Sequence, residues 1–279
     1  MRPSEILHRA TSYLQRHGVD SPRTSAEVLL SEVLRTDRAG LYARAEGLST
    51  AEAKAFGRAL CQRCTGVPLQ HLTGRQAFRH LELVVRPGVF VPRPETEVLV
   101  DVALQALPTG PAAAPTVVDV GTGSGAVALA IKQERPDVSV FATDLSAAAI
   151  ALAGENAGRL GLDVCFLPGD LVEPLPGELL GRVDVVVSNP PYVSGEDVSS
   201  LPAEVRADPE LALLGGTTVH RRLADESRRW LRPGGALVVE IAETQGQEVR
   251  GILLDGGFQD VRVVRDLAGR DRVVAGSVR

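Results

Sequence analysis

Several residue types and patterns are scarce in this chain of 279 residues, and each scarcity excludes a class of protein. Lysine occurs only as Lys54 and Lys132, and the formal net charge is −5 at pH 7. A protein that holds nucleic acid by bulk electrostatics carries a basic patch. We therefore expect no direct nucleic-acid substrate.

Long apolar runs are also missing. None approaches the ~20 residues needed to cross a bilayer. The segment Met1–Glu5 opens an amphipathic pattern rather than the apolar core of a signal peptide. The hydrophobic content of 44% and the charged content of 23% are typical of a globular protein. We expect a cytoplasmic monomer that makes no contact with membranes.

Cysteine is rare, with three residues in the chain. An odd count in a chain of this length does not describe a disulfide framework. Cys61 and Cys64 form a Cys-x-x-Cys pair, but a zinc site needs about four ligands. Only Cys165 remains, and no histidine stands at a matching spacing. The pair is therefore interpreted as structural, and no metal site is predicted.

Residues 1–74 have the pattern of a small helical bundle. Apolar residues recur at helical spacing from Ile6 to Leu14, and again within Pro22–Leu34. A short helix is expected around Leu41, and Ser49 with Glu52 forms a capping box that starts a fourth helix. No catalytic constellation occurs in this stretch. Its expected role is substrate recognition or docking.

The apolar period changes to two between residues 75 and 92, which predicts a β-hairpin that links two domains. Arg93-Pro94-Glu95-Thr96-Glu97 follows and opens a helix through Leu107. Proline and acidic residues are favourable in a first helical turn, so a well-formed helix start explains the glutamates. It does not explain Arg93, which stands between two prolines.

The third predicted domain, residues 93–279, alternates strands and helices. Strands separated by helices form a mainly parallel, doubly wound α/β sheet, and two closing strands predict an antiparallel edge. The expected strands are 116–120, 138–143, 164–167, 183–187, 236–241, 261–264 and 272–276.

A glycine-rich turn follows the first of these strands, at Asp119–Gly125. Glycines let the backbone pass close to a ligand, and the next helix offers unpaired N–H groups. The turn departs from the dinucleotide fingerprint and lacks the Gly-Lys-Ser/Thr of a P-loop. Asp144 ends the second strand about 20 residues later, where a carboxylate can accept both hydroxyls of a ribose. Together they predict a cofactor that contains adenosine, with Asp170 placed where an acid could face the adenine amino group.

Asn189-Pro190-Pro191-Tyr192 follows the buried run Val183–Val187. Taken alone, this is a strand that ends in a rigid turn, because proline lacks an N–H and fixes φ. With the glycine turn and Asp144 it resembles the class I S-adenosylmethionine-dependent methyltransferases that act on planar nitrogens. An amide nitrogen is a poor nucleophile. The Asn189 side-chain oxygen and the Pro190 carbonyl can each accept one of its N–H bonds and orient it for transfer, while the Tyr192 ring can stack on the flat acceptor.

Over nearly its whole length the chain resembles one family, the peptide-chain release factor glutamine methyltransferases (PrmC/HemK). The segments that carry the resemblance are 68–74, 91–97, 121–125, 188–192 and 265–274. The Arg93–Glu97 element is the most specific of them, because related ribosomal-protein glutamine methyltransferases differ there.

The resemblance implies a seven-stranded class I methyltransferase sheet and transfer of a methyl group from S-adenosyl-L-methionine. The acceptor it implies is the glutamine amide in the Gly-Gly-Gln motif of class 1 release factors. It implies these cofactor contacts: Gly121, Thr122, Gly123, Ser124, Gly125, Asp144, Leu145, Asp170, Leu171 and Asn189. It assigns catalysis to Asn189, Pro190 and Tyr192, and substrate binding to these residues with Pro191, Arg93 and Glu97.

Two positions depart from the family pattern: Leu171 replaces an aromatic residue found in some members, and Thr217-Thr218 replaces a common Asp-Gly or Ser-Gly step. Three alternatives stay open at this point. The acceptor could be a ribosomal-protein glutamine or a nucleic-acid base amino group, and the chain could bind the cofactor without catalysis. The acidic charge balance and Arg93–Glu97 disfavour a nucleic-acid acceptor, and the intact Asn189 disfavours a module that only binds.

Overall fold

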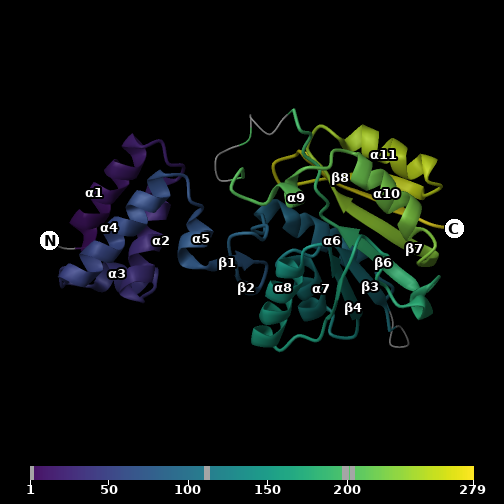
Figure 1. Cartoon of the computed structure of the whole chain (residues 1–279), viewed down its shortest axis with the longest axis horizontal. Helices are drawn as coiled ribbons and strands as arrows, with labels where there is room; N and C mark the ends of the chain where they lie inside the picture. The colour runs from purple at the N-terminus through teal and green to yellow at the C-terminus, as the bar shows by residue number, and fades with distance from the viewer. Residues whose placement is uncertain (1–2, 110–113, 197–200, 202–204) are drawn as a thin grey trace. The chain divides into compact units, whose positions relative to one another are not determined.

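The computed structural model describes residues 3–109, 114–196, 201 and 205–279 (Figure 1). The chain separates into two compact units. Unit 1 comprises residues 1–75 with 202–207, and unit 2 comprises residues 76–201 with 208–279. Residues 110–113, in the stretch rich in Pro, Gly and Ala that precedes the predicted strand 116–120, lie outside the described residues. The division of the chain at residues 74 and 92 stays a prediction.

Unit 1 is helical around its own apolar core, in which Leu14, Leu30 and Leu41 are fully buried. The predicted capping box is confirmed: Ser49 Oγ accepts from the Glu52 N–H, and Glu52 Oε2 accepts from the Ser49 N–H. The helices are α1 (Pro3–Arg16), α2 (Pro22–Leu34), α3 (Arg38–Ala43), α4 (Thr50–Cys64) and α5 (Leu69–Thr73).

A two-stranded hairpin, β1 (Arg75–Phe78) and β2 (Leu81–Val84), follows these helices. The sequence pattern extended this hairpin to residue 91, but residues 89–91 form no strand. Prolines at 87 and 92 lack N–H donors and flank the segment, so no regular ladder can continue there. Val89 and Val91 are buried nonetheless, so their apolar character reflects packing rather than pairing.

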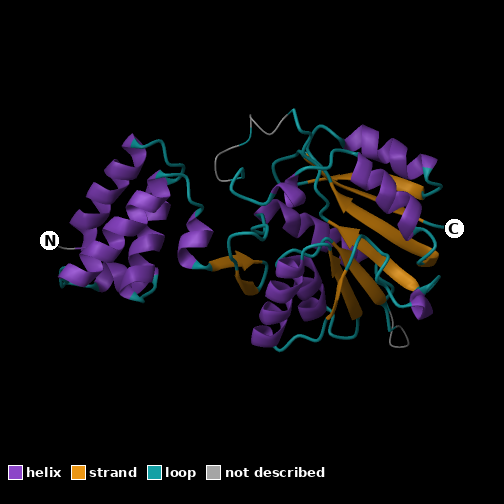
Figure 2. Cartoon of the chain, in the orientation of Figure 1, coloured by secondary structure: helices purple, strands orange, loops and turns teal. Residues whose placement is uncertain are grey.

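Unit 2 contains a seven-stranded sheet with the order β5-β4-β3-β6-β7-β9-β8 (Figure 2). β3, β4, β5, β6 and β7 are parallel, and β9 pairs antiparallel with both β7 and β8. The predicted fold class is therefore confirmed. The strands are β3 (Thr116–Val120), β4 (Ser139–Asp144), β5 (Cys165–Pro168), β6 (Val183–Ser188), β7 (Leu231–Glu240), β8 (Gln259–Arg265) and β9 (Asp271–Ser277).

Helices cover both faces of this sheet, as Figure 1 shows. One core joins α6 (Glu97–Ala106), α7 (Ala126–Glu134) and α8 (Ala147–Leu160) to one face. A second core joins α10 (Thr218–Ser227) and α11 (Gly246–Asp255) to the other. All of β6 is buried, as expected for a central strand covered on both sides. The short elements are η1 (Pro94–Thr96), η2 (Gly177–Leu179) and α9 (Glu210–Leu213).

The parallel strands bring their carboxyl ends to one edge of the sheet. Asp144 is the last residue of β4, and Asn189 directly follows β6. Ligands of open α/β sheets bind outside this edge. The order reverses here, because β4 and β5 lie on one side of β3 whereas β6 and β7 lie on the other.

Candidate functional site

The glycine turn after β3 leaves a stretch of backbone open. Gly121 and Gly123 have φ values of 73° and 57°, a left-handed conformation that favours glycine. A Cβ at Gly123 would meet nothing within 4 Å, and one at Gly121 would meet only the Asn189 carbonyl, at 4.0 Å. Ser124 Oγ is buried and makes no hydrogen bond within the described part of the chain. An open turn with an unpaired buried hydroxyl fits a bound polar group.

Asp119 holds this turn from inside the sheet. Its Oδ2 accepts from Thr122 Oγ1 at 2.7 Å and from the Ala128 N–H at 3.1 Å. Burial raises the pKa of Asp119 to about 7, against the opposing effect of these two hydrogen bonds. The motif Asp119–Gly125 stood out in the sequence, but no role was predicted for its acid. The one acid among the valines of its strand was a visible signal.

Asp144 fastens the same turn from the neighbouring strand. Its Oδ2 accepts from the Gly123 N–H and its Oδ1 from the Ser146 N–H, both at 2.8 Å. Burial raises the pKa of Asp144 above its ordinary value. Each carboxylate oxygen can accept further hydrogen bonds, so Asp144 is anchored and still able to receive the hydroxyls of a ribose. Leu145 beside it is exposed.

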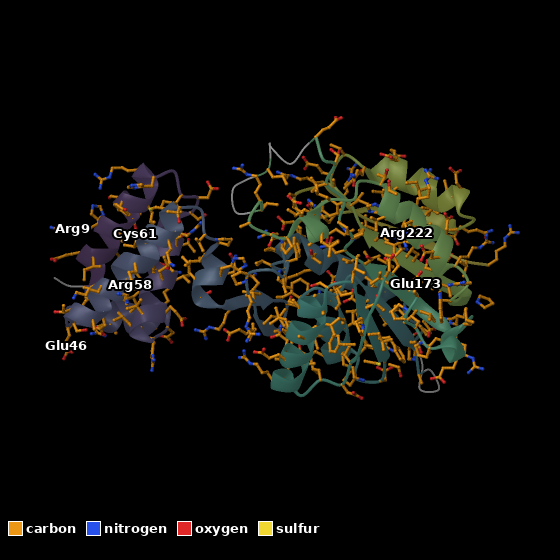
Figure 3. All side chains as sticks on the ribbon, in the orientation of Figure 1. Arg9, Glu46, Arg58, Cys61, Glu173 and Arg222 are labelled. Carbon is orange, nitrogen blue, oxygen red and sulfur yellow. The ribbon has the colours of Figure 1, made fainter. Side chains whose placement is uncertain are left out.

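Asp170 and Leu171 follow β5 at the same edge. Arg222 on α10 donates to Asp170 Oδ2 at 2.9 Å, and Figure 3 labels this arginine. Thr143 Oγ1 donates to the Leu171 carbonyl at 2.7 Å, and Leu171 adopts a φ of 44°. The threonine thus holds a non-glycine residue in a left-handed conformation. The structure therefore brings all the predicted cofactor segments to the ends of β3, β4, β5 and β6.

Asn189–Tyr192 is anchored on several sides. Ser188 Oγ donates to the Val120 carbonyl at 2.7 Å, which ties the end of β6 to the end of β3. Asn189 Nδ2 donates to Thr96 Oγ1 at 3.2 Å. Tyr192 Oη donates to Glu240 Oε1 at 3.4 Å, and the Tyr192 carbonyl accepts from Gln245 Nε2 at 3.0 Å. Burial raises the pKa of Tyr192 well above its usual range, so it stays protonated.

Thr96 and Glu240 join the site without having been predicted. Thr96 is 3% exposed in η1, and Glu240 is 1% exposed at the end of β7. Burial raises the pKa of Glu240 to about 7, against the Thr96 hydroxyl, the Arg272 charge and the Tyr192 hydroxyl. An acid near the end of an apolar strand was a visible signal. The same reasoning had selected Asp144.

Arg93 and Glu97 both have partners within the protein. Arg93 Nη2 pairs with Asp208, whose side chain is fully buried and which also accepts from the Val91 N–H. Glu97 Oε1 accepts from the Arg79 N–H at 2.9 Å. These contacts explain the arginine between two prolines as an anchor for the segment from Val91 to Arg93. The role of Arg93 and Glu97 in substrate binding stays a prediction.

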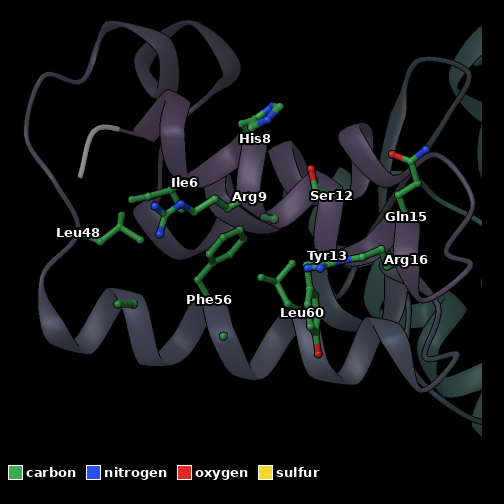
Figure 4. Close-up of a pocket in the computed structure, with 13 residues that line it drawn as sticks. Ile6, His8, Arg9, Ser12, Tyr13, Gln15, Arg16, Leu48, Phe56 and Leu60 are labelled. Carbon is green, nitrogen blue, oxygen red and sulfur yellow. The ribbon is translucent and has the colours of Figure 1, made fainter.

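Unit 1 carries a separate groove of about 950 Å³ between α1 and α4 (Figure 4). Phe56 and Leu60 of α4 face Ile6 and Tyr13 of α1 across it. Cys61, on the same helix, is exposed and free of a disulfide (Figure 3). Among the described residues, no group of three or more His, Cys, Asp or Glu side chains could hold a metal ion. In all the ranges that the structure describes, no helix is long and apolar enough to span a membrane.

The sheet order, the glycine turn and the acids at the strand ends define a methyltransferase of the class I fold. Comparison with known proteins agrees. The model of the methyltransferase small domain matches residues 80–205, and that of the PrmC N-terminal domain matches residues 5–74. A ribosomal RNA N2-G1207 methyltransferase from T. thermophilus shares the fold, with a TM-score of 0.53 and 20% identity over 74% of this chain and 50% of that one.

Two curated relatives cover nearly the whole chain. The release factor glutamine methyltransferase of Moorella thermoacetica is 42% identical over 96% of this chain and 95% of its own. That of Deinococcus radiodurans is 41% identical over 98% of both chains. The chain belongs to the release factor glutamine methyltransferase family, which confirms the resemblance found in the sequence.

Proposed function

We propose that this protein transfers a methyl group from S-adenosyl-L-methionine to the side-chain amide nitrogen of the glutamine in the Gly-Gly-Gln motif of class 1 peptide-chain release factors. The relatives at about 40% identity over the full length support this acceptor. The observation that carries the proposal is the orientation of Asn189. Its Nδ2 is engaged by Thr96, so Oδ1 is the part of the amide that can accept a hydrogen bond from a substrate.

The cofactor fits the turn and the strand ends. The turn Gly121–Gly125, open at Gly121 and Gly123, would hold its methionine part, and Asp144 would accept from the ribose hydroxyls. Asp170 and Leu171 would line the adenine, with Leu145 beside them. When bound, the cofactor supplies an electrophilic methyl group on a sulfonium centre. Asp119 keeps the turn in place and would not itself contact the cofactor.

Catalysis consists mainly of orientation. Asn189 Oδ1 and the Pro190 carbonyl each accept one N–H of the glutamine amide, which fixes the nitrogen and turns its lone pair toward the methyl group. Holding two reactants in this geometry contributes several kcal/mol. Tyr192 and Pro191 flank the flat amide. No base is needed before transfer, because the nitrogen becomes acidic as its new bond forms.

One assay tests the reaction. The protein is incubated with methyl-labelled S-adenosyl-L-methionine and a purified class 1 release factor, and the label is located by peptide mass spectrometry. We expect it on the glutamine of Gly-Gly-Gln and nowhere in a release factor that carries alanine there. Label on a ribosomal protein or a nucleic acid, with none on the release factor, would overturn the proposal.

We propose further that unit 1 recognises the release factor through the groove between α1 and α4. Residues 1–75 contain 11 Lys or Arg and 7 Asp or Glu, whereas residues 76–279 contain 19 and 28. Exposed Arg9 and Arg16 border the apolar groove, so an amphipathic segment with acidic residues matches it in both respects.

Gly57 offers a direct test of this groove. It lines the groove on α4, and a Cβ there would meet nothing within 4 Å. We expect Gly57→Leu to fill the groove and raise KM for the release factor, with no change in KM for a short Gly-Gly-Gln peptide. Gly57→Ala is the matched control. Equal KM values for the release factor in all three proteins would exclude the groove as its binding site.

We expect the protein to be a cytoplasmic monomer, as suits an enzyme that acts in translation. Size-exclusion chromatography with light scattering measures its oligomeric state.

A further inference from the structure

The side-chain amide of Asn189 has two chemically opposite ends. Oδ1 accepts hydrogen bonds, whereas Nδ2 donates them. A glutamine amide that is held through its N–H groups requires the oxygen end of Asn189. If the Asn189 amide rotated by 180°, its own N–H donors would face the N–H donors of the glutamine. A contact between the protein and the end of the Asn189 amide that does not face the substrate must therefore select one orientation.

Thr96 Oγ1 makes that contact, accepting from Asn189 Nδ2 at 3.2 Å. A hydroxyl carries one proton and can either donate or accept toward a given neighbour. Thr96 acts as an acceptor toward Asn189 only when its own proton is directed elsewhere. The residue is 3% exposed, so bulk water does not compete for that proton.

Glu240 is the group that can take the proton. Its carboxyl is 1% exposed at the end of β7, next to β6, where Val239 pairs with Ser188. The Thr96 hydroxyl stabilises its charged form, and Tyr192 Oη donates to its Oε1. A carboxylate only accepts hydrogen bonds. Tyr192 Oη directs its proton toward Oε1, and the buried Oε2, which makes no hydrogen bond within the described part of the chain, is left to accept the proton of Thr96.

We propose that Thr96 and Glu240 are positioning residues that orient the acceptor clamp, which consists of Asn189 Oδ1 and the Pro190 carbonyl. Glu240 accepts a hydrogen bond from the Thr96 hydroxyl, and Thr96 Oγ1 accepts one from Asn189 Nδ2. Asn189 Oδ1 is then left to face the substrate amide. The inference rests on the proposed function for its substrate. The orientation of Asn189 itself belongs to the free protein and can be measured without turnover.

The groups around Glu240 determine when this chain of hydrogen bonds operates. Arg272 on β9 favours the charged form and Glu95 on η1 opposes it, while Tyr192 donates to it. His220 Nε2 on α10 lies 2.9 Å from the backbone carbonyl oxygen of Glu240, and burial lowers the His220 pKa, which favours its neutral form. Burial raises the pKa of Glu240 to about 7. Below that pH a protonated Glu240 can donate to Thr96, which reverses the polarity at Asn189.

Three variants test the activity. Thr96→Val keeps the shape but removes the hydroxyl, and we expect kcat to fall about 10- to 100-fold with the cofactor Kd unchanged. Thr96→Ser restores the hydroxyl and should recover most of the rate. In the wild type kcat falls as the pH drops through about 7, and Glu240→Gln loses this limb. Glu243→Gln, at an exposed position three residues away, is the control that keeps it. Wild-type kcat in Thr96→Val, or an acidic limb retained in Glu240→Gln, would overturn the proposal.

A measurement without substrate separates this inference from the proposed function. The Asn189 side-chain amide protons are assigned by NMR against Asn189→Ala, and their exchange with solvent is followed. We expect them to be protected above pH 7 in the wild type and Thr96→Ser, and exposed in Thr96→Val. Protection that is equal in Thr96→Val contradicts the inference whatever the enzyme methylates. Failure of the wild type to label release factor, with protection intact, refutes only the proposed substrate.

Discussion

Gly215 lies directly against the backbone of Pro191. A Cβ built at position 215 would stand 2.3 Å from the Pro191 carbonyl oxygen and 2.8 Å from Val219 Cγ2. The Gly215 N–H also donates to the Val193 carbonyl at 3.1 Å. The loop after β6 therefore depends on a residue without a side chain more than twenty positions later in the chain.

Gly215→Ala tests this dependence. The added methyl group must displace Pro191 and with it the acceptor clamp, whereas the glycine turn and Asp144 lie on other strands. We expect kcat to fall by about tenfold or more and the cofactor Kd to stay within about twofold. Gly195→Ala is the control, because a Cβ there meets nothing within 4 Å. A normal kcat in Gly215→Ala would show that the clamp tolerates displacement.

Asn189→Ala removes the side-chain acceptor for the glutamine amide. Orientation of the nitrogen then depends on the Pro190 carbonyl alone. We expect kcat to fall by about 10³-fold, which corresponds to about 4 kcal/mol of transition-state stabilisation. Single-turnover kinetics give the rate, and isothermal titration calorimetry shows that the cofactor still binds. Unchanged turnover would exclude Asn189 as the clamp.

Asp144→Asn replaces one of two carboxylate oxygens, each of which accepts a backbone N–H, by an amide NH₂. Either the Gly123 or the Ser146 N–H then loses its acceptor, and a ribose loses its anionic partner. We expect the cofactor Kd to rise about 10- to 100-fold, or about 1.4 to 2.8 kcal/mol, measured by calorimetry. Asp163→Asn, an exposed acid on the loop before β5, is the control. Equal affinities in both variants would remove Asp144 from the site.

Glu240→Gln should change how the stability of the protein depends on pH. The folded protein holds the Glu240 proton up to a pKa of about 7, whereas the unfolded chain releases it near 4.5. The contribution of this group to stability is therefore greatest below about pH 4.5 and is lost as the pH rises through 7, by about 3 kcal/mol in total.

The variant has no such proton to lose. Urea titrations at pH 5 to 8 measure the free energy of unfolding of both proteins. The value for the variant should rise relative to that of the wild type as the pH increases, by up to about 3 kcal/mol. A difference that does not vary with pH would mean that Glu240 has an ordinary pKa.

The sequence predicted what local patterns determine. β6 was found because valine fills four of the five positions from Val183 to Val187, as suits a strand covered on both faces, and the turns were found because glycine and proline act on their own neighbours. Thr96 escaped because its partner, Asn189, stands 93 positions away. A periodicity argument cannot register such a contact.

Strand bounds failed where the chain departs from regular pairing. β7 was expected to start at Ala236, but it begins at Leu231, which pairs with Val183. The register then shifts between Val183 and Val185, so that Pro233-Gly234-Gly235 is accommodated as an irregularity. Leu171 is similar: its left-handed backbone is held by the Thr143 hydroxyl, a tertiary contact that no propensity encodes.

The place of β9 between β7 and β8 has a consequence for synthesis. β9 (Asp271–Ser277) is made after both strands that it joins, and β7, which carries Glu240, lacks one neighbour until then. A nascent or prematurely terminated chain can complete its glycine turn and its Asn-Pro-Pro-Tyr segment while the edge of β7 is still open. Such a chain would expose an unpaired strand to aggregation or proteolysis.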